Sequence, residues 1–399
     1  MPHRREFLAA ATALLAPEVP PKRIAVVNTA YYQNAHAYHI VGRFVNGYTL
    51  KGQHHQPAYR VARMFTDQYA GNDLARATAK QANIAIAGTV AEAVGDASDI
   101  VGVLLIGEQG NYPANARGQV MYPRYELFQE IVAAFRKAGR TVPVFNDKHL
   151  SYDFAKARAM YDAANELKFP LMAGSSLPVT WRVPEWEPEY GAKIEEAVVV
   201  YYADKERYGF HALEVLQCLM ERRKGGETGV KSVQTLAGDA VWRAWDRGAF
   251  SKELAEAALR RSGTRDFGRP RDHVPNPSAF LLEYRDGTRA AVLNLSGYVA
   301  DFTAAVRVAG DPKPQSVGFI LPAPPGARFF DALTFWIEAL FAKQKSPYPV
   351  ERTLLTSVVL DFAQRSAADG GAVQTHEAMH VAYAAPNASF FFRGPWADE

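Results

Sequence analysis

The sequence predicts an α/β protein that has a doubly wound parallel sheet in its first half and an α+β second half with an open, mainly antiparallel sheet. Up to about residue 175, short apolar runs of strand length alternate with segments whose apolar residues recur at helical spacing. After that point, strand-like runs follow one another across tight turns such as Asp286-Gly287. Such turns are typical of antiparallel sheet.

The composition fits a globular protein of two domains. The chain has 399 residues, which is more than one hydrophobic core usually serves. Hydrophobic residues make up 48%, charged residues 22%, and the net charge is +3. No long basic run is interleaved with aromatic residues, so a nucleic-acid partner is not expected. Cys218 is the only cysteine, which excludes an internal disulfide and a cysteine metal cluster and indicates a buried structural thiol.

Residues 1–21 are expected to be a twin-arginine export signal and its spacer. Arg4 and Arg5 precede an apolar run of small residues, and a proline-rich spacer ends at Pro21. The run is too short to span a bilayer, and no other segment is expected to be membrane-spanning. We therefore expect a periplasmic or otherwise exported protein. A cytoplasmic protein with a frayed N-terminal helix is the alternative.

Residues 22–175 are expected to form the first domain. Its strands are expected at residues 22–27, 59–65, 84–86, 99–106, 142–145 and 171–173. Its helices are expected at residues 36–45, 73–81, from about 90, 127–138, and after the candidate N-cap Ser151. Residues 46–57 form a histidine-containing insert. This alternation predicts parallel strands with helices on both faces.

Residues 176–399 are expected to form the second domain. Its strands are expected at residues 195–202, 230–236, 278–284, 290–295 and 302–308. Helices are expected at residues 210–222, and late helices at 330–341 and 353–365 are expected to close this domain. The exposed face of its sheet is a candidate surface for a homo-oligomer.

Polar residues follow two of the expected central strands. Asp147, Lys148 and His149 come directly after residues 142–145, and Glu108 lies in the loop after residues 99–106. The carboxyl ends of parallel strands form the edge at which such sheets bind ligands. A lysine at this edge can donate to a substrate oxygen or shuttle a proton. The alternative for Lys148 is a solvated loop lysine.

Three stretches resemble the Gfo/Idh/MocA (glucose-fructose oxidoreductase and inositol dehydrogenase) family. Residues 146–150, Asn-Asp-Lys-His-Leu, resemble the family's Glu-Lys-Pro segment, and residues 209–214, Gly-Phe-His-Ala-Leu-Glu, resemble its Gly-x-His-x-x-Asp turn. Residues 345–353 resemble its closing segment. The resemblance implies a Rossmann-like nucleotide-binding domain followed by a substrate domain. It also implies that Lys148 is the catalytic lysine and His211 the acid/base histidine.

The same alignment departs from the family in the nucleotide loop. Asn28, Ala30 and Gln33 stand where the family has the glycines of Gly-x-Gly-x-x-Gly, so the pyrophosphate pocket is expected to be closed or reshaped. Asn28 can adopt a positive φ, which would preserve the turn itself. The candidate cofactor is NAD or NADP. Its candidate binding residues are Asn28, Thr29, Ala30, Gln33, Asp67 and Glu108, and Asp67 is placed to accept from a ribose hydroxyl.

The candidate catalytic residues are Lys148, His211, Asp147 and Glu214. A lysine beside a histidine lowers the histidine pKa and favours its base-competent form. Glu214 is three residues after His211, on the same face of a helix, and could orient it. Arg207 stands where the family often has an aspartate, so it either favours an anionic substrate group or faces solvent. No metal site is expected.

Three functions remain open at this point. The first is an oxidoreductase that acts on a small-molecule substrate, a sugar or sugar-like polyol. The second is a non-redox enzyme of carbohydrates on the same scaffold, such as a lyase, epimerase or hydrolase. The third is a relative that binds a ligand without catalysis. The lysine and histidine favour an enzyme, and the loss of the glycines weakens the redox interpretation.

Overall fold

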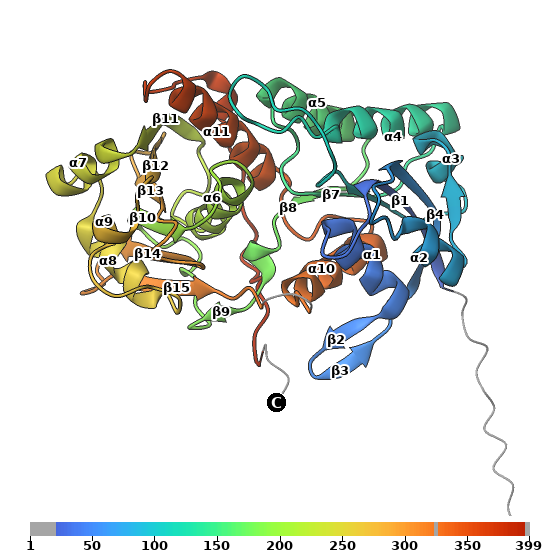
Figure 1. The fold of residues 1–399 in the computed structure, drawn as a ribbon, viewed down its shortest axis with the longest axis horizontal. Coiled ribbons are helices and arrows are strands. Elements are labelled where there is room, and N and C mark those ends of the chain that lie inside the picture. The colour runs from blue at the N-terminus through green and yellow to red at the C-terminus, as the bar shows by residue number, and fades with distance from the viewer. Residues whose placement is uncertain (1–20, 323–325, 396–399) are drawn as a thin grey trace, which may run out of the picture.

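Six parallel strands form the sheet of the N-terminal half of the computed structural model, which describes residues 21–322 and 326–395 (Figure 1). The strand order is β5-β4-β1-β6-β7-β8. The bounds are β1 Lys22–Ala30, β4 Tyr59–Gln68, β5 Ala85–Ala87, β6 Val103–Ile106, β7 Val144–Asp147 and β8 Leu171–Gly174. The chain runs outward from β1 in one direction and then in the other, so the order reverses between β1 and β6. The predicted doubly wound sheet is therefore confirmed.

Helices cover both faces of this sheet. On one face lie α1 (His36–Asn46), α2 (Ala75–Gln81) and α10 (Phe329–Lys343), packed on strand residues such as Val26 and Leu104. On the other face lie α3 (Val90–Val94), α4 (Arg124–Ala138) and α5 (Phe154–Glu166), packed on the alternate residues such as Val27 and Leu105. Both faces of β6 are buried, which explains its continuous apolar sequence.

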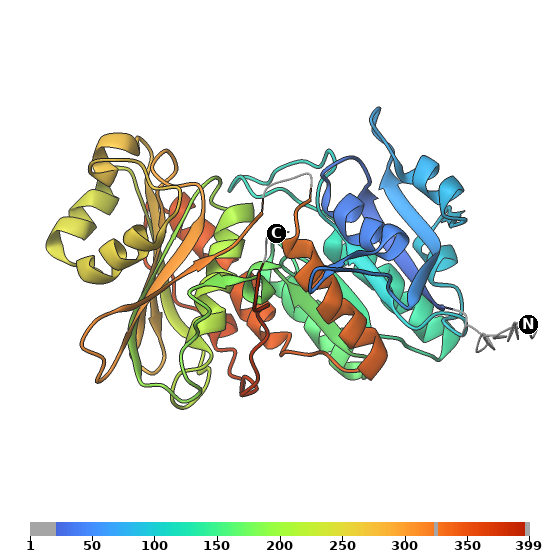
Figure 2. The ribbon, with the colours of Figure 1, turned by 90° about the horizontal axis from the view of Figure 1, so that it is seen from below.

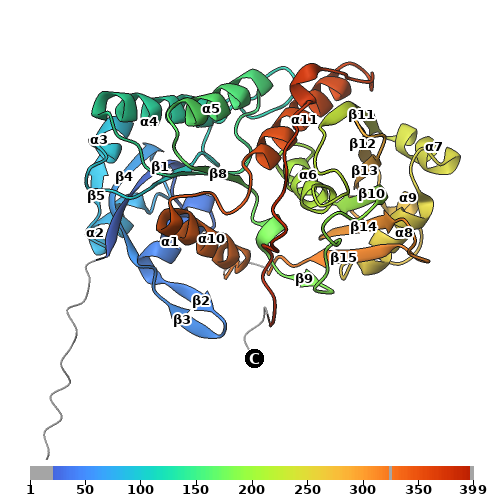
Figure 3. The ribbon, with the colours of Figure 1, turned by 180° about the vertical axis from the view of Figure 1, so that it is seen from behind.

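Helix α10 comes from the end of the chain but packs on the N-terminal sheet, beside α1 (Figure 3). The ring centroid of its Phe341 lies 5.6 Å from that of Tyr59 and 6.5 Å from that of Phe44. A side chain at Gly102 would collide with this ring. The expectation that this helix closes the second domain is therefore wrong. Its apolar residues specify burial, but nothing in their spacing says which sheet they are buried against.

The second sheet has seven strands in the order β11-β12-β13-β10-β14-β15-β9. Their bounds are β9 Arg182–Val183, β10 Ile194–Tyr201, β11 Val230–Ala237, β12 Ser278–Tyr284, β13 Arg289–Asn294, β14 Phe302–Val308 and β15 Gln315–Phe319. Neighbouring strands are antiparallel except the parallel pair β10 and β13. The predicted mainly antiparallel sheet is thus confirmed, although β9 and β15 were not expected.

Helices also cover both faces of the second sheet. One face carries α6 (Arg207–Met220) and α11 (Glu351–Ala368), and the other carries α7 (Asp239–Arg247), α8 (Lys252–Arg261) and the short α9 (Pro270–His273), yellow in Figure 2. The described part of this sheet therefore lacks the broad exposed face expected for self-association. A homo-oligomer through it stays a prediction. Helix α11 also packs on α5, so it joins the two halves.

The structure changes the expected cap of one helix and shows the fold of the histidine-containing insert. The insert at residues 46–57 is a hairpin of β2 (Tyr48–Leu50) and β3 (Gln53–His55). Helix α5 is capped by Asp153, whose carboxylate accepts from the backbone N–H groups of Ala155 and Lys156, and Ser151 is not its cap. Cys218 is free and buried, as expected. The arginine pair and apolar run of the expected export signal lie outside the described residues, and none of the described helices has the length and apolarity to cross a bilayer.

The packing of α10 on the N-terminal sheet yields a stability prediction. Phe341 is 1% exposed, whereas Phe267 is 90% exposed. Phe341→Ala should lower the free energy of unfolding by about 3 kcal/mol or more, because it removes a buried ring and leaves a cavity. Phe267→Ala should change it by less than about 0.5 kcal/mol. Urea denaturation measures both values. Equal small effects would mean that α10 does not pack as described.

Candidate active site

Strand β1 continues through the position at which the family resemblance places the glycine turn. Asn28 lies inside the strand, in register with Thr66 of β4 and Ile106 of β6. Its buried amide donates to the carbonyl of Phe65 at 2.9 Å and to the hydroxyl of Thr66 at 3.2 Å. The expectation that Asn28 adopts a positive φ in a turn is therefore wrong. The positive φ, 67°, falls at Asn34, because strand pairing holds the chain extended up to Ala30.

Side chains of the protein itself bond to polar groups that would normally bind a dinucleotide. The backbone N–H of His36, the first residue of α1, donates to the side chain of Gln109 at 3.0 Å. The ring of His36 packs edge-on against Phe330 of α10, with 5.0 Å between centroids. The hydroxyl of Tyr112 donates to Asp67 at 2.6 Å, where a ribose hydroxyl was expected.

The other expected cofactor residues are dispersed. Thr29 and Ala30 are buried, and the Thr29 hydroxyl donates to the backbone carbonyl of Glu108 at 2.8 Å. Gln33 is exposed. Helix N-termini bind phosphate through free N–H groups and a glycine turn that admits the ligand. The residues present here do not fit a pyrophosphate seated in that way.

Lys148 and His211 meet at the boundary between the two halves. Lys148 follows β7 with a φ of 69°, and its backbone N–H donates to the carbonyl of Gly174 at 3.1 Å. Its side chain is buried and its Nζ contacts Nε2 of His211, which projects from α6. A left-handed lysine is a costly conformation that surrounding structure must impose. The structure thus brings together the two residues that carried the sequence prediction.

Ser175 contacts the second nitrogen of the His211 ring. Its hydroxyl lies 2.5 Å from Nδ1 of His211 and also accepts from the backbone N–H of Leu177 at 3.0 Å. Both nitrogens of the ring are therefore bonded, one to Ser175 and one to Lys148, which fixes its orientation. Sequence reasoning missed Ser175. It directly follows β8, so the strand-end rule that identified Lys148 would also have found it.

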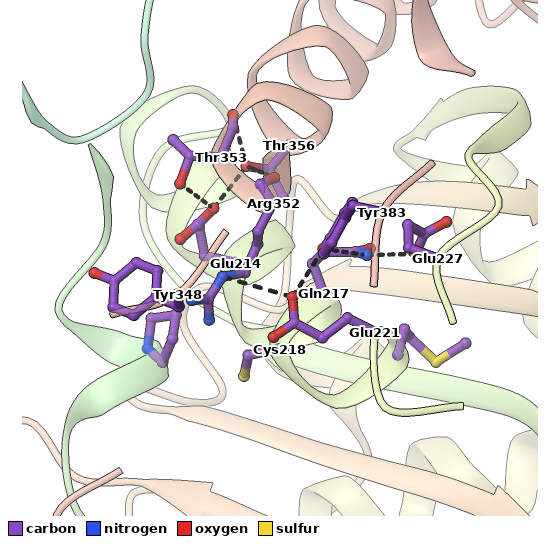
Figure 4. Close-up of polar contacts among 12 residues, drawn as sticks. Glu214, Gln217, Cys218, Glu221, Glu227, Tyr348, Arg352, Thr353, Thr356 and Tyr383 are labelled. Carbon is purple, nitrogen blue, oxygen red and sulfur yellow. Dashed lines mark hydrogen bonds and ion pairs between the residues drawn. The ribbon is translucent and has the colours of Figure 1, made fainter. Parts of the chain in front are cut away.

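Glu214 lies behind Ser175 in a buried polar network (Figure 4). Its carboxylate accepts from the hydroxyls of Thr356 at 2.7 Å and Thr353 at 3.2 Å, and from the backbone N–H of Ser175 at 3.3 Å. Arg352 is buried beside it. Glu214 therefore reaches His211 through Ser175, and its position is that of a residue that supports the site from behind.

Asp147 and Glu108 each pair with a basic residue. Asp147 pairs with Nδ1 of His36 at 2.7 Å, which links the end of β7 to the start of α1. Glu108 bonds to the fully buried Arg124, and its other oxygen lies 4.0 Å from Nζ of Lys148. Sequence reasoning missed His36 and Arg124, because nothing local marks either of these helical residues as part of a distant site.

Burial governs the electrostatics of the pair. Burial lowers the pKa of Lys148, while the negative charges of Glu108 and Asp147 raise it to a smaller extent. It also lowers the pKa of His211 well below its ordinary value, and the neighbouring Lys148 lowers it further. His211 is therefore uncharged at neutral pH and able to accept a proton.

A cavity of about 230 Å³ opens onto this pair between the two halves. Its polar lining includes Lys148, His211, Glu108 and Arg207. Its aromatic lining comes from α6, β14, α10 and the segment after β10, and consists of Tyr202, Tyr208, Phe302, Phe329 and Phe330. No group of three His, Cys, Asp or Glu side chains that could hold a metal ion occurs among the described residues.

Comparison with solved structures gives several matches over almost the whole chain. Scyllo-inositol dehydrogenase from Lactobacillus casei, with bound NAD(H) and scyllo-inositol, is 10% identical over 89% of this chain and 98% of its own, with a TM-score of 0.54. GenD2 from gentamicin A biosynthesis, in complex with NAD, is 14% identical over 90% of this chain and 97% of its own, with a TM-score of 0.53. The chain has the Gfo/Idh/MocA fold.

The similarity to proteins of this fold is structural, and the sequence identity is low. An oxidoreductase from Agrobacterium radiobacter, in complex with NAD+, L-tartaric acid and magnesium, shares the Gfo/Idh/MocA fold at 12% identity over 89% of this chain and 98% of its own, with a TM-score of 0.54. No family model matches the sequence, and no curated protein matches it. On this fold, the cavity lies at the carboxyl edge of the parallel sheet, where such sheets bind ligands.

A carboxyl group near the site gives a prediction for pH. Burial raises the pKa of Glu206 to about 7, although the backbone N–H of Val120 and the charge of Arg124 oppose this. The folded protein thus holds this proton to higher pH than the unfolded chain, so the contribution of Glu206 to the free energy of unfolding should fall from about pH 4.5 to about pH 7 and then level off.

The matched variants are Glu206→Gln and the exposed Glu130→Gln. Glu206→Gln should remove the stability loss, which amounts to roughly 3 kcal/mol because one pKa unit corresponds to about 1.4 kcal/mol. Glu130→Gln should keep the wild-type profile. Urea denaturation across this pH range measures the difference, and parallel profiles for all three proteins would contradict the prediction.

Proposed function

We propose that the chain is an oxidoreductase that acts on a hydroxyl of a sugar-like polyol in this cavity. The contact between buried Lys148 and His211 at the cavity carries the proposal, because oxidation of an alcohol requires removal of its proton. The solved neighbours support the class, since one of them binds NAD(H) and scyllo-inositol. The aromatic lining suits the apolar faces of a sugar-like ring.

Each residue of the pair has a distinct part in this proposal. In this proposal the substrate hydroxyl takes the place of the direct contact between Lys148 and His211. The uncharged His211 then accepts the hydroxyl proton at Nε2, while Lys148 donates a hydrogen bond to the hydroxyl oxygen and stabilises negative charge as it develops. Ser175 keeps the imidazole ring in place through Nδ1. Glu214 holds the backbone N–H of Ser175 and so positions this residue.

NAD or NADP is the candidate hydride acceptor in this proposal, since GenD2 was solved with NAD and the scyllo-inositol dehydrogenase with NAD(H). Strand β1 continues where the glycine turn would bind the pyrophosphate, and Gln109 bonds to the N–H at the start of α1. The cofactor would therefore require a different binding site for its pyrophosphate on this chain. The same observation favours a second candidate, a non-redox carbohydrate enzyme that uses the same acid/base pair as a lyase, epimerase or hydrolase.

Cofactor binding separates the two candidates. Titration of the purified protein with NAD(H) and NADP(H), by calorimetry or nicotinamide fluorescence, should show binding in the micromolar range if the chain is an oxidoreductase. Native mass spectrometry should then also detect any dinucleotide that copurifies. No binding at millimolar concentrations would reject the redox proposal and leave the non-redox candidate.

The catalytic pair is tested by substitution. Lys148→Met and His211→Gln should each lower kcat/KM at least 100-fold on any polyol that a screen shows to be turned over, because each removes a proton-handling group. The exposed Lys137→Met and His54→Gln are matched controls that should keep the wild-type rate. Circular dichroism checks folding. Wild-type rates in folded Lys148→Met and His211→Gln would reject the site. A protein that turns over neither a polyol nor another carbohydrate would be a binding protein.

A further inference from the structure

The charged groups at the cavity favour an anionic ligand. Lys148 and Arg207 both line it, and Glu108 is the only carboxylate among the described lining residues. Glu108 bonds to Arg124, and Asp147, next to the cavity, pairs with His36. The two carboxylates at the cavity are thus paired with basic residues, and a negatively charged group of a ligand would meet two basic side chains.

Arg207 has hydrogen-bond donors that no described residue uses. Its Nε donates to Asp204 at 3.0 Å, and the described residues offer no hydrogen-bond acceptor to its two terminal nitrogens. Its side chain is 48% exposed, and the residue lines the cavity together with Lys148. Asp204 also accepts from the backbone N–H groups of Glu206 and Arg207, which fixes the arginine at the first turn of α6.

We infer that the ligand of this cavity carries a carboxylate, which the terminal nitrogens of Arg207 bind. A carboxylate only accepts hydrogen bonds, and its two oxygens match the fork of a guanidinium group. The ligand class is therefore a sugar acid, that is, a polyhydroxylated carboxylic acid. This inference rests on the proposed function, because it assigns the substrate to the same cavity.

Aromatic side chains beside His211 can contact the hydroxyl-bearing part of such a ligand. Tyr208 stacks on Phe302 with 6.1 Å between ring centroids, and both rings lie edge-on to the ring of His211 at 6.0 Å and 6.1 Å. These aromatic faces provide an apolar surface for the carbon skeleton beside the catalytic pair. The carboxylate at Arg207 then sets which hydroxyl reaches Lys148 and His211, so Arg207 determines specificity.

Calorimetry on the purified full-length protein tests this inference with acids and their neutral counterparts. The probes are D-gluconate against D-glucitol and D-galacturonate against D-galactose. The acids should bind at least tenfold more tightly, because they add charge-assisted hydrogen bonds. Arg207→Gln should abolish the preference, and Arg207→Lys should retain part of it. Arg243→Gln, an exposed arginine on α7, is the matched control and should behave as the wild type.

The outcomes separate this inference from the proposed function. Equal binding of acids and neutral compounds, an acid preference that survives Arg207→Gln in a folded protein, or no binding of either acid at tens of millimolar would each overturn the inference. If neutral polyols were turned over with full dependence on Lys148 and His211, the proposed function would stand without it. An Arg207-dependent preference for acids without any turnover would keep the inference and reject the proposed function.

Discussion

The contact between Lys148 and His211 is the interaction on which the rest of the site depends, because it joins two halves of the chain. Lys148 reaches it only because the bridge to Gly174 holds its backbone in the left-handed region. His211 reaches it because α6 is fixed from behind, where Glu214 bonds to two threonines of α11. A side chain at Gly174 would collide with Glu214 and Thr353, so this glycine leaves the space that the network requires.

The N-terminal sheet shows how a nucleotide-binding architecture can be kept while its binding turn is rebuilt. Strand β1 is held extended by pairing with β4 as far as Ala30, by pairing with β6 as far as Asn28, and by the amide of Asn28. The first N–H of α1 is satisfied by Gln109, and Phe330 of α10 covers His36. Conserving the sheet order requires only apolar strands, whereas binding a pyrophosphate requires free N–H groups and open space. The two properties can therefore separate, and in this chain the sheet order is kept while the turn is replaced by an extended strand.

The sequence was sufficient for the fold class and for the two central residues of the site. Apolar runs such as residues 103–106 identify buried parallel strands, and polar residues at their ends, such as Lys148, identify the ligand edge. The sheet against which α10 packs could not be predicted, because burial of an apolar helix does not name its partner. His36 was missed for a related reason, because its role comes from contacts with residues distant in the sequence. Ser175 differs, since it directly follows β8 and the strand-end rule would have found it.

The protonation of His211 tests the central claim most directly. Nitrogen-15 NMR of histidine side chains, with His211→Gln to assign the signal, measures the pKa of this residue. The account predicts that His211 stays uncharged throughout about pH 6 to 8 and that Lys148→Met raises its pKa, because the lysine charge opposes protonation of the ring. A histidine that titrates at its ordinary value, and whose pKa is unchanged by Lys148→Met, would contradict the account.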